Sequence, residues 1–199
     1  MKLFVSLLSI TSSILLISSC GKSHKYDKSV KELDSLKIVV QQSVSHFKQL
    51  DSVACYNAYN KQYTYAKFIE INLKDTVSRA VADDLQLFHS LGKSMVNYLA
   101  MRPNWQNEAA LSMLQITNLT HDLKNGSVED EEAVEFINEE KKEAEKIIKE
   151  LNENTEIMHE LMQQFSQTIT TAEDVTKRIN NGVLPQLVNP TIRAQQEMD

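Results

Sequence analysis

The longest regular pattern of apolar and polar positions in the chain runs from Ser127 to about Asn181. Apolar or small residues return there at alternating steps of four and three, which is the repeat of a helix packed along its length against other helices. This stripe consists of Ile137, Ala144, Ile148, Leu151, Thr155, Met158, Met162, Phe165, Ile169, Ala172, Thr176 and Ile179, with Lys141 as the one interruption. It predicts a single helix of about 54 residues, roughly 80 Å long at ~1.5 Å per residue, with partner helices beside it.

Three further segments with helical periodicity precede this stripe. The first, from about Asp27 to Leu73, contains no proline or glycine and predicts one long helix, although Asp51-Ser52 could cap a new start and split it. Asp75-Thr76 predicts a break, because the Asp side chain can accept hydrogen bonds from the amides that follow. The next helix then runs to about Met101, with Gly92 on its apolar face, where a neighbouring backbone can come close.

Pro103 interrupts the hydrogen-bond ladder of that helix, and Asn104 can cap a third helix that ends at Asn125-Gly126. Ser127 with Asp130 has the pattern of a capping box at the start of the last helix. Two layouts follow. One is an elongated antiparallel bundle of three long rods with coiled-coil-like packing, the middle rod kinked at Pro103. The other has four antiparallel helices with a turn at Pro103. The nearly equal lengths of the three rods favour the first layout.

The composition agrees with an all-α fold. The chain has only four glycines and three prolines, too few for the many turns of a sheet protein. We expect one helical domain at 27–182, followed by a tail at 183–199 in which Asn189-Pro190 could start a short helix. The net charge is −6 and no basic cluster is present, so nucleic acid and anionic headgroups are not expected partners.

The N-terminus has the composition of an export signal. Lys2 supplies a positive charge, and residues 3–17 form an apolar stretch that is too short to serve as a stable membrane anchor. The sequence Leu16-Ile17-Ser18-Ser19-Cys20-Gly21 resembles the lipobox of bacterial lipoproteins. This resemblance implies a signal peptide at 1–19, a diacylglycerol-modified Cys20 with an acylated amino terminus, and a short tether at 20–26. With Cys20 acylated, Cys55 has no cysteine left for an intramolecular disulfide.

The residues after the lipid cysteine also bear on location. Gly21 stands where inner-membrane retention signals of many Gram-negative bacteria have Asp, and 22–25 lacks the acidic cluster that resembles surface-export tethers of Bacteroides-type lipoproteins. We therefore expect an outer-membrane lipoprotein that faces the periplasm and meets the membrane through its N-terminal lipid.

One short motif is compatible with metal chemistry. Glu156-Ile157-Met158-His159 matches the Glu-x-x-His element that di-iron helical bundles place on one helix face. Such a centre needs a second copy and two further glutamates, and the sequence has neither in a comparable setting. No glycine-rich phosphate loop or nucleophile elbow is present either. We therefore expect Glu156 and His159 to lie on a solvated face, and we expect no cofactor, no metal and no enzymatic activity.

Tyrosines are concentrated in one part of the first long helix. Tyr56, Tyr59 and Tyr63 follow each other at steps of three and four, which places them on one face. Tyrosine gives a large contact area at low entropic cost, so this face is a candidate partner-binding patch. The alternative is that the rings cover the side of the bundle. Cys55, next to them, is expected to be a small core residue.

Three short sequences suggest modification. Asp34-Ser35-Leu36, Asp51-Ser52-Val53 and Asp75-Thr76-Val77 resemble the Asp-Ser/Thr-apolar sequon of general O-glycosylation in Bacteroides-type bacteria. The resemblance implies glycans on Ser35, Ser52 and Thr76. Asp-Ser and Asp-Thr pairs are also ordinary helix caps, so that interpretation stays open.

These features together predict a lipid-anchored, non-enzymatic helical protein of the cell envelope that acts as a scaffold or interaction module with a protein partner. One alternative is a helical bundle that binds a small molecule in a cavity between its helices. Another, from a different class, is a metal-dependent enzyme centred on Glu156 and His159.

Overall fold

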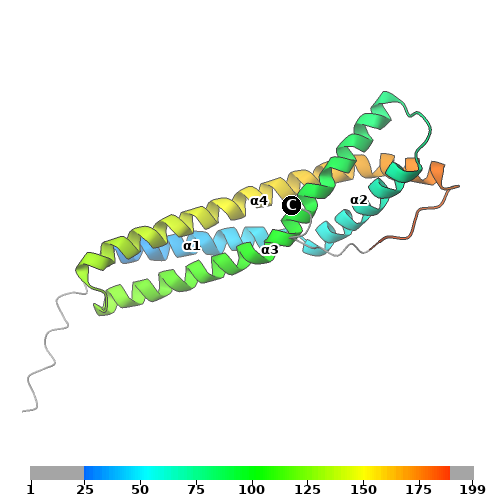
Figure 1. Cartoon of the computed structure of the whole chain (residues 1–199). Helices are drawn as coiled ribbons and strands as arrows, with labels where there is room; N and C mark the ends of the chain where they lie inside the picture. The colour runs from blue at the N-terminus through cyan, green and yellow to red at the C-terminus, as the bar shows by residue number, and fades with distance from the viewer. Residues whose placement is uncertain (1–24, 189–199) are drawn as a thin grey trace, which may run out of the picture.

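The computed structural model describes residues 25–188 and contains, within them, four α-helices and no strand (Figure 1). They are α1 (Asp27–Gln49), α2 (Ser52–Asn72), α3 (Arg79–Asn125) and α4 (Asp130–Ile179). The all-α class is confirmed. The predicted signal peptide, Cys20 and the helix start at Asn189-Pro190 lie outside the described residues.

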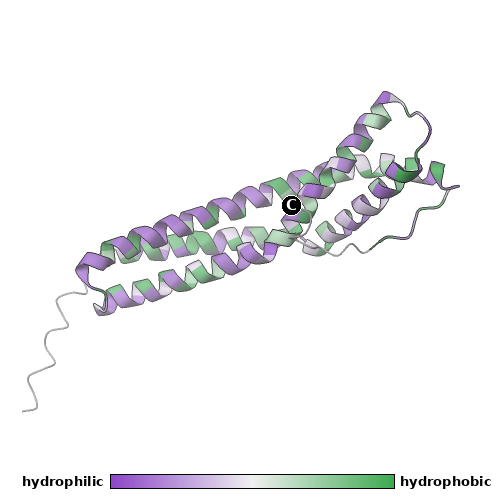
Figure 2. Cartoon of the chain, in the orientation of Figure 1, coloured by the Kyte–Doolittle hydropathy of each residue, from purple (hydrophilic) through white to green (hydrophobic). Residues whose placement is uncertain are grey.

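The bundle is three helices thick along its whole length. α3 and α4 pack against each other, α1 packs against both in one half of the rod, and α2 packs against both in the other half. α1 and α2 follow each other along the rod and do not pack together (Figure 1). Apolar residues gather on the helix faces that meet, and hydrophilic residues face outward (Figure 2). The three-rod layout is confirmed, and the layout with four antiparallel helices is wrong.

The first rod is broken between α1 and α2, which is the split that Asp51-Ser52 allowed. The Asp51 carboxylate accepts hydrogen bonds from the amides of Val53 at 2.9 Å and Ala54 at 3.1 Å, and so it caps α2. On the other side of the break, the carbonyl of Leu50 accepts a hydrogen bond from Arg102 Nη2 of α3 at 3.3 Å. Backbone groups on both sides of the break, at the start of α2 and after the end of α1, therefore have hydrogen-bond partners.

A cluster of aromatic rings fills the bundle at this break. The rings of Phe47, Tyr98 and Trp105 lie pairwise 5.8 to 6.0 Å apart, in tilted or edge-to-face arrangements. The Arg102 guanidinium lies 4.8 Å from the centre of the Phe47 ring and donates to the Tyr98 hydroxyl at 2.9 Å. α3 thus supplies most of the groups that hold the junction of α1 and α2.

The prediction of a separate third helix after Pro103 is wrong, because α3 continues through this proline. Asn104 does not cap a helix; its amide lies 3.9 Å from the sulfur of Met101. Pro103 lacks the N–H that would donate to the residue four positions earlier, so the helix loses a bond on that side. Figure 1 shows α3 changing direction in its middle part, as the predicted kink requires.

Other helix ends differ by a few residues from the predictions. Ser78, not Asp75, caps α3, and its hydroxyl accepts from the Val81 amide at 3.4 Å. α4 begins at Asp130 without a side-chain cap, so the predicted capping box of Ser127 does not form. Gly126 ends α3 in the left-handed conformation, with φ of 64°, as predicted.

The apolar stripe of α4 is wider than predicted. Its members Ile148, Met162, Ile169 and Ile179 are only half-buried, whereas the neighbouring residues Ala133, Ile147, Leu161, Thr168 and Val175 are buried. The reason is that α4 contacts α3 and a second helix at every level, so it buries two adjacent faces. Lys141, the one interruption, is half-buried at the edge of the stripe and pairs with Glu32 of α1.

Phe165 of α4 is a buried ring of this core and stacks on Phe88 of α3, with 6.1 Å between ring centroids. We expect Phe165→Ala to lower the free energy of unfolding by about 3 to 5 kcal/mol, because truncation leaves a cavity between the two helices. Phe136→Ala is the matched control on the same helix. That ring is 39% exposed, and its loss should cost less than about 1.5 kcal/mol. Urea unfolding of the purified protein measures both, and equal losses would contradict this core assignment.

Glu140 is a carboxylate within the stripe, between Ile137 and Ala144. The side chain is half-buried, and its Oε2 atom is buried without a hydrogen-bond partner within the described residues. Burial, together with the charges of Glu139 and Glu143, raises the pKa of Glu140 above its ordinary value. Glu140 is therefore a destabilising residue at neutral pH.

This position makes the stability of the bundle depend on pH. Because the pKa of Glu140 is higher in the folded state, the folded chain binds more protons than the unfolded chain between about pH 4.5 and the raised pKa. This contribution to stability therefore falls as pH rises through that interval. We expect Glu140→Gln to raise the free energy of unfolding by about 1 kcal/mol at pH 7, with the gain shrinking toward pH 4.5. Denaturant melts at both pH values test this, with Glu160→Gln, an exposed glutamate farther along α4, as control. A gain independent of pH would contradict it.

Candidate functional site: a groove between α2 and α3

A groove of about 650 Å³ lies between α2 and α3 on the described surface. A second hollow of about 340 Å³ shares Ala66, Glu70 and His89 with it and extends toward the loop between the two helices. α2 lines the main groove with residues between Tyr59 and Glu70, and α3 lines it with residues between His89 and Ala100. The volume lies in the range of about 300 to 1,000 Å³ that is usual for ligand sites.

A glutamine and a glycine set the spacing of the two helices below the groove. Gln62 of α2 is buried, and its Nε2 donates to the backbone carbonyls of Phe88 at 2.9 Å and His89 at 3.2 Å in α3. A Cβ atom on Gly92 would lie 2.5 Å from Gln62 Oε1. The predicted close approach at Gly92 is thus made by a side chain rather than by a backbone. It lets a polar group of α2 hydrogen-bond directly to the α3 backbone.

Tyrosine and lysine side chains line the α2 side of the groove. The rings of Tyr59 and Tyr63 lie 6.2 Å apart, and the Lys67 ammonium lies 5.6 Å from the centre of the Tyr63 ring. Opposite them, α3 contributes Lys93, which is exposed and has no ion pair within residues 25–188. The groove therefore combines an aromatic wall with two lysines.

The contact between Gln62 and Gly92 predicts a strong coupling between these residues. In the natural chain, Gly92→Ala must displace the Gln62 amide from its carbonyl partners, so we expect it to destabilise the fold. In the Gln62→Ala background the space is free, and Gly92→Ala should then stabilise by up to about 1 kcal/mol through helix propensity. A double-mutant cycle from urea unfolding measures the coupling, which we expect to exceed about 1 kcal/mol. Additive effects would contradict the contact.

The structure separates the three predicted tyrosines. Tyr59 and Tyr63 line the groove, whereas Tyr56 is half-buried and does not. Tyr59 is only 6% exposed, so the three rings do not form one exposed patch. The buried neighbour Cys55 is a core residue as predicted, and burial raises the pKa of its thiol.

Sequence reasoning missed the α3 side of the groove and the role of Gln62. The residues concerned on α3 are His89, Lys93, Val96, Asn97 and Ala100. One signal was present: Gln62 lies among the apolar positions of α2, and Gly92 lies among those of α3. A polar residue and a glycine at core positions together indicate a special contact, but they do not reveal that the two face each other.

Glu156 and His159, the two residues of the Glu-x-x-His motif, are both exposed on α4. The His159 ring is 6.5 Å from the ring of His46 in α1. In the part of the chain that the structure describes, no three His, Cys, Asp or Glu side chains come close enough to hold a metal ion.

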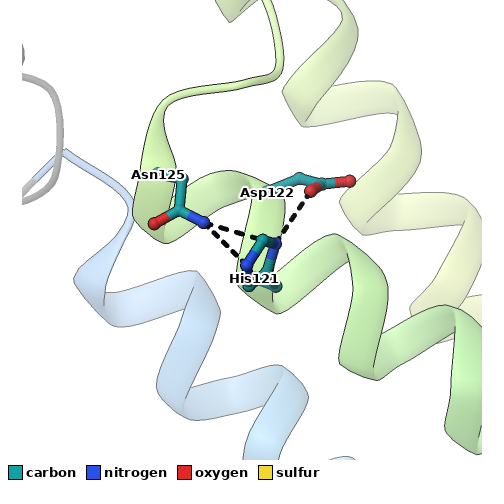
Figure 3. A network of polar contacts seen from close by, with 3 residues as sticks. All are labelled: His121, Asp122 and Asn125. Atoms are coloured by element: carbon teal, nitrogen blue, oxygen red, sulfur yellow. Dashed lines mark hydrogen bonds and ion pairs between the residues drawn. The ribbon is translucent and has the colours of Figure 1, made fainter.

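A small polar network lies at the C-terminal end of α3, where Asn125 and Asp122 both contact His121 (Figure 3). The distances are 2.9 Å from Asn125 Nδ2 to His121 Nε2 and 3.1 Å from His121 Nδ1 to Asp122 Oδ1. All three residues belong to the last turns of one helix, and His121 is exposed. We therefore interpret this network as local hydrogen bonding at the C-terminal end of α3 and not as a functional site.

The three predicted glycosylation positions are all exposed. Ser35 is in α1 and donates to the Lys31 carbonyl at 2.8 Å, Ser52 begins α2, and Thr76 lies in the loop before α3. Exposure allows a glycan at each of them, and the modification stays a prediction.

Comparison with known proteins found no match to this chain among family models, curated proteins or solved structures. Among the described helices, none is long and apolar enough to cross a membrane.

Proposed function

We propose that this chain is a lipid-anchored, non-enzymatic interaction module of the cell envelope, held in the outer membrane through Cys20 and facing the periplasm. The lipobox supports the anchor. The observation that carries the proposal is that the groove and the start of α1 lie in opposite halves of the rod (Figure 1). In this proposal the groove is the surface that meets the partner.

The start of α1 is held next to the turn between α3 and α4. Lys25 Nζ lies 2.7 Å from a carboxylate oxygen of Asp130, and the Tyr26 hydroxyl donates to the other oxygen at 2.9 Å. From Asn125, at that end of α3, the groove begins 25 residues away at Ala100. At ~1.5 Å per residue this distance is roughly 37 Å. A lipid attached six residues before Tyr26 would leave the groove well clear of the headgroups.

The side chains in the groove support recognition rather than covalent chemistry. Ser90 and His89 both line it, but the Ser90 hydroxyl donates to the Leu87 carbonyl at 2.7 Å within its own helix. A nucleophilic serine would instead donate to a general base. Among the remaining lining residues are Tyr59 and Tyr63, and tyrosine is one of the residue types that contribute most to binding surfaces.

Site-specific photocrosslinking in cells tests this proposal. We expect a photoreactive amino acid at Asn97, which lines the groove, to form protein-sized covalent adducts in the envelope. The same residue at Gln115, exposed on α3 in the other half of the rod, should form none. Val96→Trp, which fills the groove, should abolish the Asn97 adducts.

The anchor supplies a control for this experiment. Cys20→Ala should remove incorporated fatty acid and remove the protein from the outer-membrane fraction. Adducts at Gln115 as strong as those at Asn97, or a Cys20→Ala protein that stays in the outer membrane, would contradict the proposal.

A further inference from the structure

We propose that the α2–α3 groove recognises an amphipathic organic anion, a compact apolar body with one acid group, as the chemical group that the partner presents. This inference rests on the proposed function, because it names the chemistry by which the partner binds in the same groove.

The apolar body is matched by the inner walls. The inner walls of the groove carry short apolar side chains, which are Ala66 on α2 and Val96 and Ala100 on α3. The Tyr63 ring lines the α2 side of the groove. An apolar molecule placed there removes its own surface and these walls from water, at about 25 cal/mol for each Å². Tyr63 can also offer a ring face to an aromatic body.

The acid group is matched by the charges at the mouth. Lys67 and Lys93 come from opposite walls, while Glu70 is the one carboxylate that lines the groove. Lys67 contacts the Tyr63 hydroxyl at 3.4 Å and the Tyr63 ring, and neither lysine has an ion pair within the described residues. The groove thus has a local excess of positive charge on a chain whose net charge is −6. Lysine ammonium groups beside apolar walls attract and orient an anion.

The buried contact below keeps this arrangement rigid. Gln62 ties α2 to the α3 backbone, and Gly92 lets the helices stay close at that level. The groove therefore exists before any ligand binds, which reduces the ordering cost of association.

Two fluorescent probes that differ chiefly in one acid group test the inference. Anilinonaphthalene sulfonate is an aromatic anion, and N-phenylnaphthylamine is its uncharged counterpart. The protein is the expected mature chain, residues 20–199 with Cys20→Ser, so that neither its own acyl groups nor the apolar stretch at 3–17 can compete for the probes. We expect saturable binding of one sulfonate probe per chain, and binding of the uncharged probe that is weaker by at least about tenfold.

Charge variants then locate the site. Lys67→Gln with Lys93→Gln should weaken the sulfonate probe by at least about tenfold and leave the uncharged probe within about twofold. Lys48→Gln with Lys142→Gln, two exposed lysines away from the groove, is the matched control and should change neither. Val96→Trp should abolish binding of both probes. Equal affinity for the two probes, or sulfonate binding that is unaffected by the groove lysines, would overturn the proposal.

The outcomes separate this inference from the proposed function. Loss of probe selectivity with intact Asn97 adducts in cells would overturn the anion site and leave the interaction module standing. Lysine-dependent anion binding without any Asn97 adduct would support the anion site. It would also replace the protein partner with a small molecule.

Discussion

The structure depends on the packing of α4 against α3, because these two helices run beside each other along the whole rod. A pair of helices alone would leave part of each apolar stripe exposed to water. A third helix must therefore pack against both α3 and α4 along the whole rod. α1 takes this position in one half and α2 in the other. A stripe that faces two partners is wider than a two-stranded seam, which is why Ile147, Leu161 and Thr168 are buried beside the predicted positions.

The change from α1 to α2 and the bend of α3 occur in the same region of the rod. Asp51 starts α2, Pro103 removes a backbone donor from α3, and Arg102 joins the two by hydrogen-bonding the Leu50 carbonyl. Beyond this junction α2 takes the place of α1, and its buried Gln62 hydrogen-bonds to the α3 backbone. The groove lies beside this contact, between α2 and α3.

Part of the candidate site could be predicted from the sequence. Tyr59 and Tyr63 were identified because their spacing places them on one helix face, and spacing along a helix is a local property. Lys93 and Val96 were not identified, because nothing local connects them with residues about 30 positions earlier in the chain. Tyr56 fits the same spacing but does not line the groove.

The sequence by itself determined the helical class, the last long helix to within a few residues and the left-handed end at Gly126. Each of these depends on residues close together in the chain: a repeat of three and four, or a backbone φ that glycine adopts readily. The tertiary structure decided that α3 continues through Pro103, that Phe165 meets Phe88, and that Gln62 lies against Gly92. Packing free energy from neighbouring helices outweighs the local cost of a proline or glycine in a helix, and only the assembled bundle shows where it does so.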